Sequence, residues 1–123
     1  MKLLLFNLPE GKTQAMRLLL AGRGVDIRTV EAADFCQPIG FLAGLPGFPA
    51  VKPFAAAFGE EMMVLCGFDQ QQLADTLDGL RQAGVPPVPL KAVLTQHNAG
   101  WSALALRGEL LRERDEIARS LRK

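Results

Sequence analysis

The chain repeats itself: residues 4–30 align without gaps on residues 64–90, at a constant offset of 60. Glycines recur at matching places, as at Gly24 and Gly84, and leucines do the same. Each copy has the pattern of a strand, a helix, a glycine-containing turn and a second strand. The repeat therefore predicts two βαβ halves joined by a long connector.

The length of the chain fits one domain. A chain of 123 residues buries roughly 65 to 70% of its unfolded surface, which is enough for a core without metal or disulfide. We predict a single domain over residues 1–123. Its parts are a first βαβ half at 2–32, a connector at 33–60, a second βαβ half at 61–95 and a C-terminal helix at 102–121.

The hydrophobic pattern predicts two central and two edge strands. Residues 3–6 and 62–66 are continuous apolar runs, typical of strands covered on both faces, whereas 27–32 and 90–94 include polar residues. The near-exact repeat favours an α+β, ferredoxin-like duplicated βαβ fold (βαββαβ), with a long connector after strand 2 and an extra C-terminal helix. The alternative is a four-stranded parallel α/β sheet, in which part of the connector forms a crossover helix.

Charge and cysteine content argue against several partners. The 14 basic and 13 acidic residues give a net charge of +1 and are spread along the chain, so we expect no nucleic acid partner. No apolar run approaches the roughly 20 residues that span a bilayer, and we expect no membrane partner. Cys36 and Cys66 match neither a disulfide framework nor a metal knuckle. A cytoplasmic, soluble protein is the prediction.

The connector holds four of the eight prolines and is rich in glycine and phenylalanine. Loops longer than about 12 to 15 residues inside a domain tend to be functional or mobile. One interpretation is a packed loop that covers an edge of the sheet. The other is a loop that faces a ligand or partner, which makes Gln37, Gly40 and Gly44 candidate site residues.

Residues 91–101 contain the densest group of hydrogen-bonding side chains in the chain. Helix N-termini after strand ends present N–H groups and a favourable dipole to anions, so Thr95, His97 and Asn98 are candidates to bind a small anion or polar ligand. Helix capping by these residues is the alternative. Lys91 adds a positive charge, and Trp101 is either a core anchor or a stacking surface.

No catalytic or metal centre is predicted. His97 is the only histidine, and no Asp, Glu or Cys stands near it at ligand spacing. Cys66 ends a central strand, where cysteine usually behaves as a small buried hydrophobe. A nucleophilic pair of His97 and Cys66 is the alternative.

The last predicted helix carries Leu106, Leu110, Ile117 and Leu121 near one face. Such a stripe predicts a helix that docks on the sheet of its own chain. Pairing of this helix with another subunit, in a homo-oligomer, is the alternative.

Three segments resemble a bacterial and archaeal family, domain of unknown function 3783. They are Gln-Pro-Ile-Gly-Phe-Leu-Ala-Gly-Leu at 37–45, Glu-Met-Met-Val-Leu-Cys-Gly-Phe at 61–68, and the segment 90–101 with its Asn98 and Trp101. The resemblance implies a prokaryotic source and no particular activity or cofactor. It places emphasis on the connector and on 91–101.

Together these features predict a non-enzymatic small-ligand or regulatory binding module. One alternative is a small enzyme that uses Lys91 and His97 on an anionic substrate, and another is a protein-interaction module that works through the C-terminal helix. The binding hypothesis requires 37–48 and 95–101 to line one cleft. Its candidate ligand-binding residues are Gln37, Gly40, Gly44, Lys91, Thr95, His97, Asn98 and Trp101.

Overall fold

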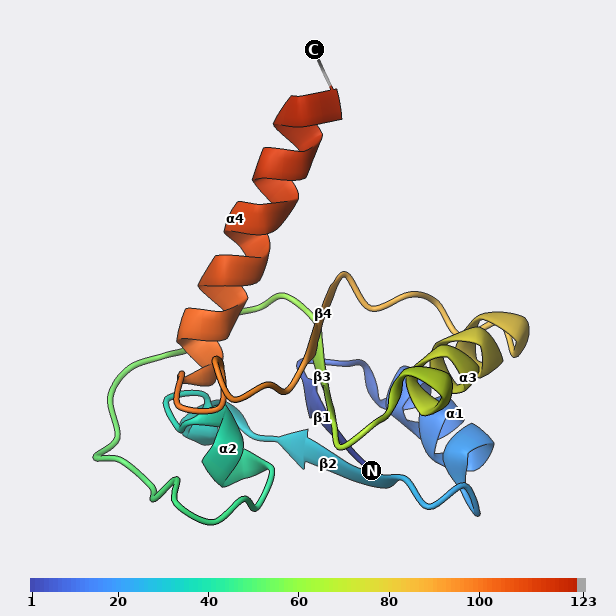
Figure 1. Ribbon diagram of the computed structural model, residues 1–123, viewed down its shortest axis with the longest axis horizontal. Coiled ribbons are helices and arrows are strands. Elements are labelled where there is room, and N and C mark those ends of the chain that lie inside the picture. The colour runs from blue at the N-terminus through green and yellow to red at the C-terminus, as the bar shows by residue number, and fades with distance from the viewer. Residues whose placement is uncertain (122–123) are drawn as a thin grey trace.

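The computed structural model describes residues 1–121, which form a mixed α+β fold around one four-stranded sheet (Figure 1). Its elements, in chain order, are β1 (Lys2–Phe6), α1 (Glu10–Leu20), β2 (Asp26–Val30), the 3-10 turn η1 (Ala32–Asp34), α2 (Ile39–Leu42), β3 (Met62–Cys66), α3 (Gln70–Gln82), β4 (Leu90–Val93) and α4 (Ala103–Leu121).

The strands lie in the order β2-β1-β3-β4. β1 pairs with β2 and β3 pairs with β4 in parallel, whereas β1 and β3 are antiparallel. The prediction of β1 and β3 as central strands is confirmed, but the ferredoxin-like topology is wrong, because it would place β2 beside β3 and β4 beside β1. The parallel alternative is also wrong, since β1 and β3 run in opposite directions. A βαβ unit can set its second strand beside the first or one position away, and an edge strand has the same hydrophobic pattern in both cases.

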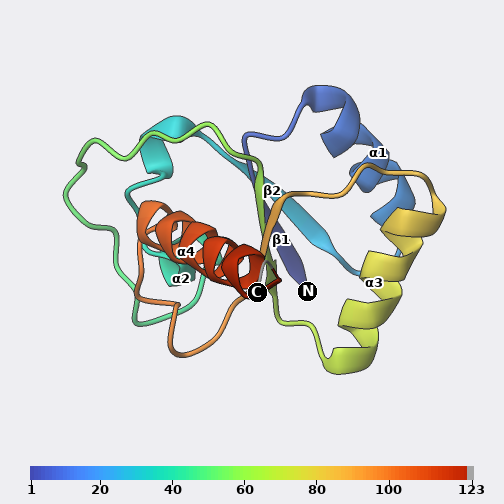
Figure 2. The same cartoon turned by 90° about the horizontal axis from the view of Figure 1, so that it is seen from above.

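One face of the sheet is covered by α1 and α3, which contact each other. Figures 1 and 2 show both helices on the same side of the strands, with α2 and the base of α4 on the opposite side. Alternate strand residues point to each side, as the pleat requires. The residues of the α1/α3 face form one buried cluster with Leu3, Leu5, Met16, Leu20, Met63, Leu65, Leu80 and Val88.

The opposite face is covered by the connector and the base of α4. Leu4, Phe6 and Val64 point to this side and are buried. Phe35 and Phe58 of the connector stack at 4.5 Å between ring centroids, and Phe35 meets Phe6 edge-on at 5.5 Å. The connector is therefore a packed loop, but it covers a face of the sheet rather than the predicted edge.

The two halves use similar local signals at corresponding places. The backbone is left-handed at Asn7 (φ 63°) and Gly67 (φ 76°), between strand and helix, and at Gly24 (φ 72°) and Gly84 (φ 76°), after each helix. Glycine adopts this conformation at no steric cost. The predicted glycine-containing turn after each helix is therefore confirmed. At the start of α3, Asp69 forms a capping box with Gln72.

Only the first part of α4 docks on the sheet. Ala103 and Leu106 are buried there, and the Arg107 guanidinium donates to both carboxylate oxygens of Glu60, at 3.0 and 2.7 Å. The outer part projects away from the sheet (Figure 1), and Ile117 and Leu121 are 62% and 81% exposed. Of the helices within residues 1–121, none is both long and apolar enough to cross a membrane.

Candidate functional site

The two segments that the binding hypothesis required to be close do lie side by side. The N–H of Ile39 donates to the carbonyl of Trp101 at 2.8 Å, and the N–H of Gly40 donates to that of Ala99 at 2.7 Å. A short β-bridge joins Pro38 to Ser102. These backbone hydrogen bonds hold the two segments in direct contact.

The Gln37 side chain is used within the protein. It is buried, its Nε2 donates to the carbonyl of Val51 at 3.1 Å, and its Oε1 accepts from the N–H of Val51 at 2.8 Å. Both ends of the amide are therefore occupied by one backbone residue. Gln37 fixes the middle of the connector to its beginning.

Thr95 and Asn98 bond to each other's backbone and form a closed turn. Asn98 Oδ1 accepts from the N–H of Thr95 at 2.9 Å, and Thr95 Oγ1 accepts from the N–H of Asn98 at 3.2 Å. Asn98 Nδ2 donates to the carbonyl of Val93 at 3.0 Å. Both side chains thus stabilise the turn at 95–98 rather than a helix end, because α4 begins at Ala103 and it is Ser102 Oγ that accepts from the N–H of Ala105, at 3.1 Å.

Packing explains why position 40 is a glycine, and backbone conformation explains why position 44 is one. A Cβ on Gly40 would lie 2.6 Å from Cγ of Phe48 and 3.0 Å from the Ala99 carbonyl oxygen. Gly44 has φ of +79°, a left-handed conformation that glycine adopts without strain. Neither position needs a ligand to explain its residue.

His97 and Trp101 meet edge-on, with ring centroids 5.0 Å apart. Together with Glu109 and Glu113 they line a pocket of about 320 Å³ between β4, the 95–101 turn and α4. A hydrogen bond from Arg112 keeps the pKa of Glu109 below its usual value, so this carboxylate is charged at neutral pH. Lys91 also lines this pocket, so a wall with two carboxylates and one lysine does not favour the anion that the sequence predicted here.

The side chain of Lys91 points to the other face of the sheet. Lys91 pairs with Met63 in the parallel β3–β4 register, and Met63 belongs to the cluster under α1 and α3. Partners in such a register point the same way. Lys91 and His97 both line the pocket of about 320 Å³, but the Lys91 ammonium group donates to the carbonyl of Val88 at 3.3 Å, on the side of α1 and α3, and is thus directed away from the His97 ring.

Cys66 does not supply a reactive thiol to either side. It is buried in the cluster beneath the connector and α4, and burial raises the pKa of its thiol to about 11. A nucleophilic cysteine needs a lowered pKa, because the thiolate is the reacting form. Within residues 1–121, no group of three or more His, Cys, Asp and Glu side chains could hold a metal ion.

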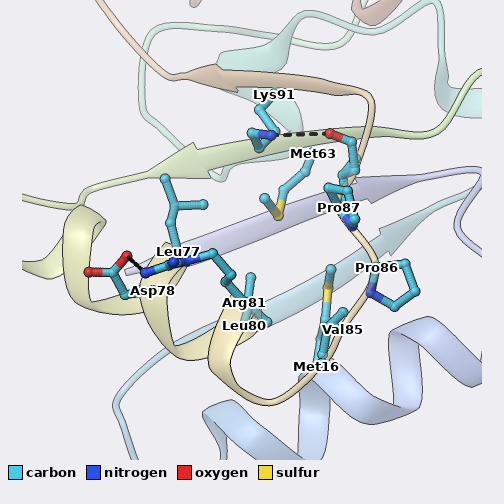
Figure 3. Close-up of a pocket in the computed structure, with 12 residues that line it drawn as sticks. Met16, Met63, Leu77, Asp78, Leu80, Arg81, Val85, Pro86, Pro87 and Lys91 are labelled. Carbon is cyan, nitrogen blue, oxygen red and sulfur yellow. Dashed lines mark hydrogen bonds and ion pairs between the residues drawn. The ribbon is translucent and has the colours of Figure 1, made fainter.

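The side chain of Lys91 also lies at a larger cavity, which we call the methionine cavity (Figure 3). Its volume is about 590 Å³, and it lies between α1, α3, the segment 84–88 and the strands β3 and β4. Its charged groups are Lys91 and the ion pair of Arg81 with Asp78, at 3.1 Å. The apolar lining comes from Met16, Met63, Leu77, Leu80, Val85, Pro86, Pro87 and Val88.

The segment 84–88 forms one wall because the repeat fails there. In the first half, β2 begins two residues after Gly24, whereas β4 begins at Leu90, six residues after Gly84. Pro86, Pro87 and Pro89 occupy the additional length, and proline cannot donate a hydrogen bond to a neighbouring strand. The prolines therefore hold this segment outside the sheet.

Lys12 anchors the same wall from α1. Its Nζ lies 2.5 Å from Oε1 of Glu61 and donates to the carbonyl of Pro87 at 2.9 Å, and its side chain is only 9% exposed. The sequence hypothesis missed this cavity, because the methionines and leucines that line it have the pattern of ordinary core residues. The signal that could have located it is the group Pro86, Pro87 and Pro89, which stands where the first copy has its second strand.

Residues 61–117 match the model of a protein family described as a domain of unknown function (DUF3783). The matched part runs from β3 into α4 and contains the predicted site residues between Lys91 and Trp101, whereas those of the connector lie outside it. No curated protein and no solved structure gives a significant match to the chain. The predicted resemblance to domain of unknown function 3783 is confirmed, over residues 61–117.

Proposed function

We propose that the protein is a small-molecule binding module whose ligand combines an apolar body with one acidic group. The ligand occupies the methionine cavity, with its acidic group beside Lys91. Pockets for small molecules are typically about 300 to 1,000 Å³, mostly apolar, with few polar groups that fix the orientation. The cavity, at about 590 Å³, has this size and this distribution of groups.

The observation that carries the proposal is the position of the Lys91 ammonium group. Within residues 1–121 it forms no ion pair, and its hydrogen bond goes to the carbonyl of Val88 at 3.3 Å. The other cation of the rim, Arg81, is already paired with Asp78. One positive charge is thus left for an anionic group of the ligand.

The cavity walls suit an apolar body of variable shape. Met16 and Met63 form part of the lining, and thioether side chains adjust to irregular surfaces. Lys12 fixes the wall formed by residues 84–88 through Glu61 and Pro87, so the site exists before ligand arrives. Preorganisation of this kind reduces the ordering cost of binding.

The test compares octanoate with 1-octanol, which share an apolar chain and differ in charge. Titration calorimetry on the wild type should detect both, and octanoate should stabilise the fold by about 2.7 kcal/mol at a hundredfold excess over Kd. Lys91→Met should lower the affinity for octanoate roughly tenfold, which corresponds to about 1.4 kcal/mol of binding free energy. The affinity for 1-octanol should stay unchanged. Lys52→Met is the matched control, because Lys52 is an exposed lysine of the connector.

A second pair of variants tests the location. Leu77→Trp adds bulk to a half-buried residue of the lining and should abolish binding of both compounds. Leu18→Trp adds the same bulk to an exposed residue of α1 outside the lining and should have no effect. The proposal fails if straight-chain carboxylates from butanoate to dodecanoate do not bind, or if octanoate binds Leu77→Trp and Lys91→Met as it binds the wild type.

A further inference from the structure

Helix α4 contains two copies of a seven-residue unit. Residues 107–113 are Arg-Gly-Glu-Leu-Leu-Arg-Glu, and residues 114–120 are Arg-Asp-Glu-Ile-Ala-Arg-Ser. Arginine, glutamate and the apolar pair recur at the same places, and both copies lie in one continuous helix. A seven-residue apolar period keeps the same face of a helix toward a partner, as in paired helices.

The first copy is bound to its own chain. Arg107 forms two hydrogen bonds with Glu60, and its guanidinium carbon lies 5.8 Å from the ring centroid of Phe58. Leu110 and Leu111 pack on the buried cluster beneath the connector. This copy thus shows how an arginine and an apolar pair of α4 dock on a surface.

The second copy has an arginine and an apolar pair at the same places, but within residues 1–121 these side chains do not pack on the rest of the chain. Its Ile117 is 62% exposed, and Leu121, one turn further along the same face, is 81% exposed. Arg114, the counterpart of Arg107, is exposed and forms no ion pair within residues 1–121. The helix projects from the body at this point (Figure 1), so the surrounding chain does not cover it.

We propose that this outer part of α4 pairs with the same part of α4 in a second copy of the chain, in antiparallel orientation. The charges support a self-complementary contact, because Arg114 lies in the apolar stripe and Glu113 lies at its edge. An antiparallel partner brings its own Glu113 toward Arg114 and receives the same in return. Each arginine then has a carboxylate partner, as Arg107 has in Glu60.

The antiparallel orientation also follows from where the bodies lie. The base of each helix is embedded in its own fold, and antiparallel pairing places the two bodies at opposite ends of the contact. It also brings the exposed Leu121 of one helix to the half-buried Leu110 of the other. A parallel pair would instead place the two folded bodies side by side at the same end of the contact.

The contact is short. Residues 110–121 span about 18 Å at roughly 1.5 Å per residue, so the dimer should form only at high protein concentration. The proposal is independent of the methionine cavity, which lies under α3 on the other face of the sheet. Loss of dimerisation would therefore leave octanoate binding unchanged.

Sedimentation equilibrium tests the association. The wild type should shift from the monomer mass toward twice that mass as concentration rises, and Ile117→Glu or Arg114→Glu should raise the dissociation constant roughly tenfold or more. Leu18→Glu, at a residue of α1 that is 77% exposed, is the control and should dimerise as the wild type does. A monomer mass at every concentration, or a dimer unaffected by Ile117→Glu and Arg114→Glu, would overturn the proposal.

Pyrene labels test the orientation, because excimer emission requires the two labels to be close. A label on Ala118→Cys, at the edge of the apolar stripe, lies about 7.5 Å along the axis from the same label on an antiparallel partner and should give excimer emission, whereas a label on Leu121→Cys should not. The native Cys36 and Cys66 are buried, so the introduced thiol takes the label. Excimer emission from Leu121→Cys would show a parallel pair and overturn the proposed orientation.

Discussion

Leu4 lies directly opposite Val64 in the antiparallel pairing of β1 with β3, and Val64 is also the residue that the 60-residue offset assigns to Leu4. The neighbouring pairs are consistent, since Leu3 pairs with Leu65 and Leu5 with Met63. A local two-fold axis therefore passes through the sheet between Leu4 and Val64.

This axis explains the asymmetry between the two faces of the sheet. A two-fold axis perpendicular to the sheet keeps α1 and α3 on the same face, where they contact each other. The other face is left to segments without a repeat partner, the connector and the base of α4. The methionine cavity lies on the symmetric face, at the place where residues 84–88 break the symmetry.

Gly40→Ala should destabilise the protein by about 1 to 3 kcal/mol, the usual cost of overpacking. The added Cβ would lie 2.6 Å from the Phe48 ring and press on the Ala99 carbonyl, where the connector meets the 95–101 turn. Urea denaturation measures the effect. Gly108→Ala is the control, because no atom would lie within 4 Å of its Cβ, and this change in α4 should stabilise by about 0.5 to 1 kcal/mol. Equal stability of both variants would contradict the packing argument.

The elements of this fold could be predicted from the sequence, but the strand order could not. Continuous apolar runs and turn glycines such as Gly84 act locally, and the structure confirms the elements predicted from them. The choice of neighbour for β2 depends on contacts between distant segments, which an edge-strand pattern does not record.

The candidate site shows the same division. Polar residues were identified where the chain is most polar, but Gln37, Thr95 and Asn98 bond to nearby backbone. Only long-range packing determines whether a polar side chain faces a ligand or the backbone. Lys91 lines a larger cavity because the β3–β4 register places it beside Met63, and that register was not predictable from composition.

Asn98→Ala should cost about 1 to 3 kcal/mol, because it leaves the N–H of Thr95 and the carbonyl of Val93 without their side-chain partners. Hydrogen exchange at the Thr95 amide should become faster. His97→Ala, at the exposed neighbour, should stay within about 0.5 kcal/mol of the wild type. Octanoate binding should be unaffected by Asn98→Ala, since Asn98 does not line the methionine cavity. A loss of octanoate affinity in this variant would return the ligand to the originally predicted site.

The buried thiol of Cys66 should make the fold less stable at alkaline pH. Burial raises its pKa from 9.0 to about 11, so between these values the unfolded chain releases the thiol proton and the folded chain retains it. Stability then falls as pH rises through this window, by up to about 2 to 3 kcal/mol, and the full contribution is present below pH of about 9. The chain contains no tyrosine, so tyrosine ionisation adds nothing here. Urea unfolding under reducing conditions measures the difference in unfolding free energy between the wild type and Cys66→Ala. This difference should shift in favour of the variant between pH 8 and pH 11. A constant difference would show that the folded state does not raise the pKa of this thiol.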